Sequence, residues 1–217
     1  MLKLLFARKL FLIGWLFIAL VALSFLLIYG KAQSHIYATS FHVQLTDELF
    51  KYLTLLGNGL FIVMLSFLVS FIRLRWFFLI LLSFIISGLL AQILKNFAFP
   101  GAMRPVAFFD GIYNLHIVHG VKMLRSHSFP SGHSASAFAL FFALAHITRR
   151  WHWEIFFLLM AFAVAYSRVY LSQHFLIDIL AGSFLGIISV VFSLMILKRI
   201  EKPWFDNNLR NLLKHAD

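Results

Sequence analysis

The chain has 217 residues, of which 62% are hydrophobic and only 12% are charged, and its formal net charge at pH 7 is +11. Soluble domains carry about 45 to 50% apolar and about 25% charged residues, so this chain lacks the polar material to cover a water-exposed surface. The composition therefore excludes a soluble enzyme and a disordered protein, and the absence of cysteine excludes a disulfide scaffold, a thiolate metal site and a cysteine nucleophile.

Six segments are apolar enough to cross a membrane. A spanning helix needs about 20 such residues, because each residue rises about 1.5 Å and the hydrocarbon core is about 30 Å thick. The segments lie at about 10–30, 52–72, 76–94, 131–148, 155–172 and 175–197. The last three are spans only if a few ionisable groups are allowed near their ends. The expected fold is an all-α integral membrane protein, a six-helix bundle that forms a single domain over residues 1–217.

The basic residues indicate which side of the membrane each connection faces. With six spans both termini lie on one side, and 12 of the 19 Lys and Arg residues fall there. Cytoplasmic segments are rich in Lys and Arg, so both termini are expected to be cytoplasmic and the connection 96–130 extracytoplasmic. Because the cations are scattered between apolar runs, nucleic acid is not an expected partner.

The first span follows three basic residues, Lys3, Arg8 and Lys9, as the apolar part of a secretory signal peptide would. Its apolar region is longer than the roughly 7 to 15 residues typical of a signal. A retained membrane anchor is therefore the favoured interpretation.

Cations at the ends of these segments converge on the extracytoplasmic side. Lys95 ends the third span, Arg168 ends the fifth, and Arg104 lies in the long connection between the third and fourth. Three cations without as many acids indicate an anion site, and phosphate suits them because Arg binds its oxygens bidentately while Lys adds a point charge. Ser131 and Gly132 directly precede a helix, whose N-terminal amides would add donors to the same oxygens.

Two histidines are expected at the same membrane face. His133 starts the fourth span, and His174, which starts the sixth, lies four residues before Asp178 and so on the same helical face. Asp178 can accept the Nδ1 proton of His174 and leave Nε2 as a nucleophile for phosphorus, which would give a phosphohistidine. His133 is then the general acid for the leaving oxygen. Since the three cations can neutralise the phosphoryl oxygens, neither a metal nor another cofactor is expected.

Three motifs resemble those of the type 2 phosphatidic acid phosphatase superfamily. Pro-Ser-Gly-His is present at residues 130–133, and Ser-Arg-x5-His-x3-Asp at residues 167–178. The third motif, Lys-x6-Arg-Pro, has two extra residues between Lys95 and Arg104. These extra residues fall around Pro100, where a bulge in the chain would still let both cations reach a phosphate.

The resemblance implies residue roles and a class of substrate. By resemblance His174 is the nucleophile, Asp178 its orienting partner and His133 the acid. The phosphate cradle would consist of Lys95, Arg104, Ser131, Gly132 and Arg168. Members of the superfamily are six-helix, metal-independent membrane enzymes that dephosphorylate lipids such as phosphatidic acid, phosphatidylglycerol phosphate or undecaprenyl diphosphate. The expected activity is that of a lipid phosphate phosphatase in the plasma or inner membrane, with its site on the extracytoplasmic face.

Two alternative interpretations concern the cationic site and the histidines of the long connection. A transporter or flippase would use the same cations to bind a lipid phosphate without cleaving it, although only an enzyme requires the pair of His174 and Asp178. Three histidines in the long connection, His116, His119 and His127, also suggest a metal site. Asp110 is the one carboxylate near them, and loop histidines are commonly polar surface, so the metal interpretation is disfavoured.

Gly182 and Gly186 form a Gly-x3-Gly pattern in the last span. Such a pattern either marks a close approach between helices or carries no structural meaning. Both interpretations are compatible with the sequence.

Overall fold

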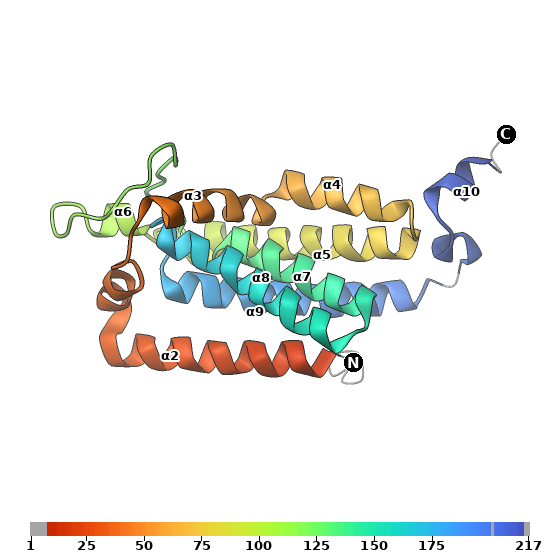
Figure 1. Ribbon diagram of the computed structural model, residues 1–217, viewed down its shortest axis with the longest axis horizontal. Helices are drawn as coiled ribbons and strands as arrows, with labels where there is room; N and C mark the ends of the chain where they lie inside the picture. The colour runs from red at the N-terminus through yellow and green to blue at the C-terminus, as the bar shows by residue number, and fades with distance from the viewer. Residues whose placement is uncertain (1–7, 201, 215–217) are drawn as a thin grey trace.

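The computed structural model describes residues 8–200 and 202–214, in which the regular elements are all helices (Figure 1). The longer helices are α2 (Lys9–Ala38), α3 (Gln44–Leu53), α4 (Gly59–Ser70), α5 (Leu74–Ile93), α7 (Gly132–Thr148), α8 (Trp151–Tyr170) and α9 (Leu176–Lys198). The shorter elements are the 3₁₀ turns η2 (Thr54–Gly57) and η4 (Pro203–Asp206), the π-helical turn η3 (Leu94–Ala98), and the helices α6 (Pro105–Phe108) and α10 (Leu209–Lys214).

Four helices in the described part of the chain are long and apolar enough to cross a membrane, namely α2, α5 continued by η3, α8 and α9. A fifth span results if α3 with η2 and α4, which meet at 57°, are taken together. Helix α7 is apolar but has only 17 residues. The predicted all-α membrane fold is therefore confirmed with four or five apolar spans, and α5, α7, α8 and α9 begin within a few residues of their predicted positions.

The segment predicted as one span over 52–72 is broken at Asn58. Asn58 has an extended backbone with ψ of 140°, and its side-chain oxygen accepts a hydrogen bond from the backbone N–H of Leu60 at 3.1 Å. Asparagine in this position caps the start of a new helix, because its oxygen satisfies a backbone donor that the helix leaves unpaired. The apolar composition of the segment is correctly predicted, but the cap and the glycines on both sides of it change its direction.

Helix α7 is the centre of the bundle. It packs against α5, α8 and α9, and all of its residues from Ser134 to Ala143 are buried. Six of the first eight residues of α7 are Ser, Ala or Gly, the exceptions being His133 and Phe138, so neighbouring helices can approach its backbone closely. The position of α7 thereby fixes where its N-terminal residues lie relative to α9.

Glycines bring α9 against the start of α7. A Cβ atom at Gly182 would lie 2.4 Å from the carbonyl oxygen of Ser131, and one at Gly186 would lie 2.4 Å from that of Ala135. No larger residue fits at this separation unless the helices move apart. The Gly-x3-Gly pattern therefore marks close helix packing, and the interpretation without structural meaning is wrong.

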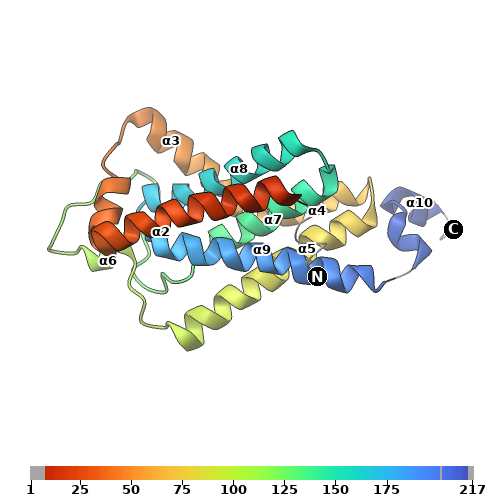
Figure 2. The same cartoon turned by 90° about the horizontal axis from the view of Figure 1, so that it is seen from below.

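The two ends of the bundle carry different features (Figures 1 and 2). One end holds α10 and the beginning of α2, where Glu154 accepts a hydrogen bond from Arg8 at 3.3 Å and Arg75 donates to Asp206 at 2.8 Å. The opposite end holds α6, the connection between α5 and α7, and the beginnings of α7 and α9. The residues predicted to carry the chemistry all belong to this second end.

We expect Gly186→Ala to destabilise the protein, because the added methyl group would overlap the backbone of α7. Overpacking of this kind typically costs about 1 to 3 kcal/mol of unfolding free energy. The thermal unfolding midpoint in detergent should fall, whereas Gly88→Ala on α5, where no atom lies within 4 Å of the added Cβ, should leave it unchanged or raise it. Equal midpoints for the two variants would contradict the close approach.

Candidate functional site

The predicted site residues come from five segments that meet at one end of the bundle. Lys95 lies in η3, Arg104 immediately precedes α6, Ser131 to His133 begin α7, Arg168 lies in the last turn of α8, and His174 and Asp178 lie at the start of α9. The ring of His133 interacts electrostatically with Arg168, His174, Lys95 and Arg104. The structure thus brings together the cations and histidines that the sequence predicts at one membrane face.

Asp178 organises the histidine side of the site. Its Oδ2 atom accepts hydrogen bonds from the hydroxyl of Ser128 at 2.5 Å and from the backbone N–H of Phe175 at 2.9 Å, and it lies 3.4 Å from Nδ1 of His174. A carboxylate in the first turn of a helix is also stabilised by the helix dipole. Bonds to Ser128 of the long connection and to the backbone just before α9 therefore hold Asp178 in place, with its Oδ2 facing His174.

His174 is held neutral by its surroundings. Its residue surface is 2% exposed, and burial lowers the pKa of its imidazole to about 3. The backbone N–H groups of Gln173 and His174 both donate to the carbonyl oxygen of Arg168, at 2.9 and 3.1 Å, which fixes the turn between α8 and α9. A neutral imidazole with Nδ1 facing a carboxylate has its Nε2 lone pair available for attack.

The three predicted cations are buried, and within the described residues some of their donors lack a hydrogen-bond partner. Lys95 is 9% exposed and Arg168 is 8% exposed. Within the described residues, Lys95 makes no hydrogen bond, and the Nε atom of Arg168 is buried without an acceptor. Arg168 does donate from Nη1 to the hydroxyl of Thr54 at 2.8 Å. Because burying an unpaired charge is costly, donors left in this state indicate a site for an anion.

Arg104 is more fully bonded than the sequence suggests. Its Nε donates to the carbonyl oxygen of Ser126 at 2.9 Å, and its Nη1 donates to the backbone and side-chain oxygens of Gln173 at 3.1 and 3.2 Å. Burial lowers the pKa of its guanidinium. Arg104 thus fastens the long connection to the turn that carries His174, and in the described part of the chain Nη2 is the nitrogen without a bond.

The longer spacing between Lys95 and Arg104 is absorbed by local structure. The turn η3 is π-helical, and it ends with the N–H of Phe99 bonded to the carbonyl oxygen of Leu94 at 2.8 Å. A turn follows at Pro100, where the sequence predicts a bulge. The ammonium of Lys95 lies 3.9 Å from the position that a Cβ of Gly132 would occupy, so Lys95 still reaches the start of α7.

Ser131 acts first as a helix cap. Its hydroxyl oxygen accepts hydrogen bonds from the N–H of Ser134 at 3.3 Å and from the hydroxyl of Ser134 at 3.0 Å. Its own N–H donates to the carbonyl oxygen of Asp178 at 2.9 Å, which ties α7 to α9. The hydroxyl proton of Ser131 is left for another acceptor, so this arrangement is compatible with the phosphate contact that the sequence predicts.

Four residues that support the site are not predicted from the sequence. Ser128 bonds Asp178, Gln173 bonds Arg104, Thr54 bonds Arg168, and Nε2 of the buried His35 lies 3.3 Å from the hydroxyl of Ser172. Ser128 lies two residues before Pro-Ser-Gly-His, and Gln173 lies within the motif at residues 167–178, so both could have been suspected from their positions. Thr54 and His35 belong to other helices, and only the tertiary structure brings them to the site.

The histidines of the long connection do not gather with one another in the described structure. His127 bonds the hydroxyl of Ser126 at 3.0 Å, Asp110 pairs with Arg125, and His116 bonds Asp47 at 2.8 Å. Among the described residues, His116 lies in one cluster of potential ligands with His42 and Asp47, and not with His119, His127 or Asp110.

Comparison with protein families and with known proteins gives a consistent result. The family model described as PAP2 superfamily matches residues 76–202, more than half of the chain. The chain is 30% identical to the bacitracin transport permease protein BcrC of Bacillus licheniformis over 113 residues, and these cover 51% of this chain and 50% of that protein. It is 35% identical to the lipid A 4'-phosphatase of Bacteroides thetaiotaomicron over 98 residues, covering 44% and 43%.

A third relative is the undecaprenyl-diphosphatase of Sulfolobus acidocaldarius, 30% identical over 107 residues that cover 49% of this chain and 48% of that protein. The matches thus span about half the length of each of these relatives. The crystal structure of Aquifex aeolicus LpxE superposes with a TM-score of 0.68 at 25% identity and covers 76% of this chain and 94% of its own. The crystal structure of the PAP2 type phosphatidylglycerolphosphate phosphatase of Bacillus subtilis superposes with a TM-score of 0.63 at 21% identity. The match covers 91% of this chain and 99% of that one, and it shows the same fold.

The lowered pKa of His174 makes the stability of the protein depend on pH. The unfolded chain takes up a proton on this histidine near pH 6.5, whereas the folded chain does so only near pH 3. The stabilisation is therefore complete above about pH 6.5 and is lost as the pH falls toward 3. Between pH 7 and 4 the unfolding midpoint of the wild type should fall more steeply than that of His174→Asn. Equal slopes for the two proteins would contradict a buried neutral His174.

Proposed function

The chain belongs to the PAP2 superfamily, and from this premise we propose that it is an integral membrane hydrolase that removes phosphate from a lipid phosphate. The observation that carries the proposal is the neutral His174, paired with Asp178 and facing buried cations with unsatisfied donors. Two relatives bear names of lipid phosphatases, a lipid A 4'-phosphatase and an undecaprenyl-diphosphatase, which supports a substrate of this class. The reaction would break a phosphomonoester or diphosphate bond.

In the proposed first step, Nε2 of His174 attacks phosphorus, and the bond between phosphorus and the leaving oxygen breaks. His133 gives a proton to that oxygen, while Asp178 stabilises the positive charge that develops on the imidazole of His174. Lys95, Arg104 and Arg168 neutralise the phosphoryl oxygens, a task that bound metal ions perform in many other phosphoryl transfer enzymes. The product of this step is a phosphohistidine and the dephosphorylated lipid.

In the second step, His133 takes a proton from water, and the resulting hydroxide attacks phosphorus. The bond between phosphorus and His174 breaks, which releases inorganic phosphate and restores the neutral imidazole. Ser131 and the amides at the start of α7 would hold the same oxygens throughout, with Gly132 leaving room for Lys95 beside them. The proposed catalysis needs no metal and no other cofactor.

A second candidate function is binding or transport of a lipid phosphate without cleavage. One relative is named a transport permease, and the cations alone would serve either function. The shared bonds of Asp178 to Ser128, to Phe175 and to His174 favour the enzyme, because binding alone does not require an oriented neutral imidazole. The two functions differ in whether the lipid phosphate is recovered intact.

We further propose that the chain crosses the membrane six times, with α7 as a short buried span and α3 to α4 as a broken one. This topology places both termini in the cytoplasm and the site on the extracytoplasmic face. Supporting it, the turn between α7 and α8, which carries Arg149 and Arg150, and the end of α9, which carries Lys198 and Arg199, lie at the same end of the bundle as the start of α2 (Figure 1). A single membrane domain would then comprise residues 1–217.

Phosphate release from lipids tests the proposed roles of His174 and Asp178 and identifies the substrate. Purified protein in excess chelator should release inorganic phosphate from one or more of phosphatidic acid, phosphatidylglycerol phosphate, prenyl diphosphates and lipid A. His174→Ala should abolish release, and Asp178→Asn should lower kcat by roughly 10²- to 10⁴-fold while KM changes little, because the imidazole loses its orientation. His119→Ala, an exposed residue of the long connection, is the matched control and should stay active. Full activity in His174→Ala, or intact recovery of every lipid from wild-type protein, would overturn the proposal.

The topology prediction uses the absence of cysteine in the chain. Asn114→Cys lies in the long connection and Asn211→Cys lies in α10, and both side chains are exposed. A membrane-impermeant maleimide added to intact cells or spheroplasts should label Asn114→Cys, whereas Asn211→Cys should react only after the membrane is permeabilised. The reverse pattern would invert the proposed orientation.

A further inference from the structure

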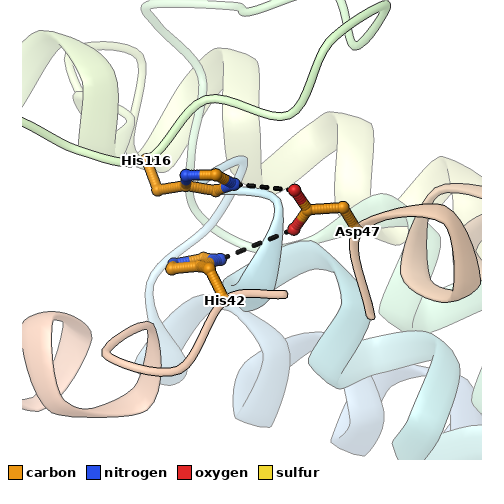
Figure 3. Close-up of side chains that lie close together, drawn as sticks. All are labelled: His42, Asp47 and His116. Atoms are coloured by element: carbon orange, nitrogen blue, oxygen red, sulfur yellow. Dashed lines mark hydrogen bonds and ion pairs between the residues drawn. The ribbon is translucent and has the colours of Figure 1, made fainter. Parts of the chain in front are cut away.

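Two histidines and an aspartate from three separate segments meet beside the long connection. His42 follows α2, Asp47 lies in the first turn of α3, and His116 lies in the connection between α5 and α7. Figure 3 shows the two rings placed one above the other, each with a nitrogen directed at a different oxygen of the carboxylate. Nε2 of His116 is 2.8 Å from Oδ2 of Asp47, and Nδ1 of His42 is 3.7 Å from Oδ1. We refer to these three residues as the His-Asp-His cluster.

The bonding of the cluster is incomplete in the described structure. Nδ1 of His42 is buried and has no hydrogen-bond partner, although it faces the carboxylate. The ligand atoms of His42, Asp47 and His116 all lie within 4.8 Å of one another. Ligands of a tetrahedral zinc ion, at about 2.0 to 2.2 Å from the metal, are separated from one another by about 3.3 Å. A small movement of His42 toward Asp47 would therefore give a zinc-like arrangement.

A hydrogen bond from Tyr170 fixes the carboxylate of Asp47. The hydroxyl of Tyr170 donates to Oδ1 of Asp47 at 2.5 Å, and the same hydroxyl lies 2.7 Å from the hydroxyl of Thr46. Metal-binding side chains are commonly oriented by such outer contacts, which reduce the movement needed when the ion binds. This contact fixes Oδ1, the oxygen that faces His42, while Oδ2 lies at hydrogen-bonding distance from His116.

We propose that the His-Asp-His cluster is a binding site for a divalent transition metal of the zinc class. Two imidazole nitrogens and one carboxylate oxygen form a ligand set that zinc accepts, with a fourth position left for water. The side chain of His116 is 41% exposed, which gives an ion access from solvent, while His42 and Asp47 are mostly enclosed, at 14% and 19%. With neutral imidazoles the cluster carries one negative charge, which favours a cation.

The metal would have a structural task, distinct from the proposed chemistry at His174. Arg104 already fastens the base of the long connection through Ser126 and Gln173. An ion on His116 would fasten a second point of the connection to α3 and, through Tyr170, to the end of α8 that carries Arg168. Bound metal should therefore stabilise the connection over the site, while phosphate release proceeds with or without it.

Zinc binding by the protein itself tests this inference. Wild-type protein purified without a polyhistidine tag, and freed of metal by chelator, is titrated with zinc chloride by calorimetry. It should bind one saturable zinc ion per chain, and its unfolding midpoint should rise with zinc concentration, because only the folded state holds the assembled ligands. Zinc should also slow tryptic cleavage after Lys122 and Arg125, both of which are exposed in the long connection.

Matched variants identify the ligands. His42→Ala and His116→Ala should lose the zinc ion and the zinc-dependent rise in midpoint, whereas His119→Ala, three residues from His116, should retain both. The inference is overturned if wild-type protein binds no saturable zinc, or if His119→Ala loses binding while His116→Ala keeps it. Should either ligand variant fail to fold, cobalt added to wild-type protein replaces it as the test. Ligand-field bands of a tetrahedral site that zinc abolishes would support the inference, and their absence would overturn it.

Discussion

The shared hydrogen bonds of Asp178 are the constraint on which the rest of the site depends. Its carboxylate accepts from Ser128 in the long connection and from the N–H of Phe175 before α9, and it faces Nδ1 of His174. Its backbone carbonyl accepts from the N–H of Ser131, the cap of α7. One residue thus joins two helix starts and a loop, so the position of the proposed nucleophile is coupled to the helix terminus that would bind its phosphate.

This junction exists only because α7 and α9 approach closely. The backbone of α9 at Gly182 lies against the carbonyl oxygen of Ser131, and any side chain there would push the two helices apart. Separation would lengthen the bond from Ser131 to Asp178, which belongs to the same region of α9. In membranes the interfaces between helices are enriched in such small residues, because they let the backbones approach closely where lipid is as apolar as the helix surfaces. The glycines therefore act on the site although they carry no reactive group.

The sequence predicts most of what depends on local pattern. Hydropathy predicts the apolar helices, and the three motifs predict which charged and imidazole side chains meet at one end of the bundle. It does not predict the break at Asn58, because the flanking residues stay apolar while the capping bond redirects the chain. Nor does the sequence predict that Thr54 lies beside Arg168 or His42 beside His116, because the residues of each pair are far apart in the chain and belong to no common motif. Such pairs follow from packing alone.

The hydrogen-bond acceptors of the buried cations explain how the site keeps its positive charge and can still bind an anion. Arg104 is held by carbonyl oxygens and Arg168 by the hydroxyl of Thr54, whereas carboxylates pair with other cations at the opposite end of the bundle. Neutral acceptors orient a guanidinium without cancelling its charge, so the positive potential at the site persists. Among these residues the one carboxylate, that of Asp178, bonds Ser128 and the N–H of Phe175 and faces His174 through Oδ2, so in the described structure it makes no ion pair with a lysine or arginine. A phosphate entering this site would relieve the repulsion among Lys95, Arg104 and Arg168. Because the equatorial oxygens stay charged while the bond between phosphorus and the leaving oxygen breaks, the same attraction to the cations is retained in the transition state.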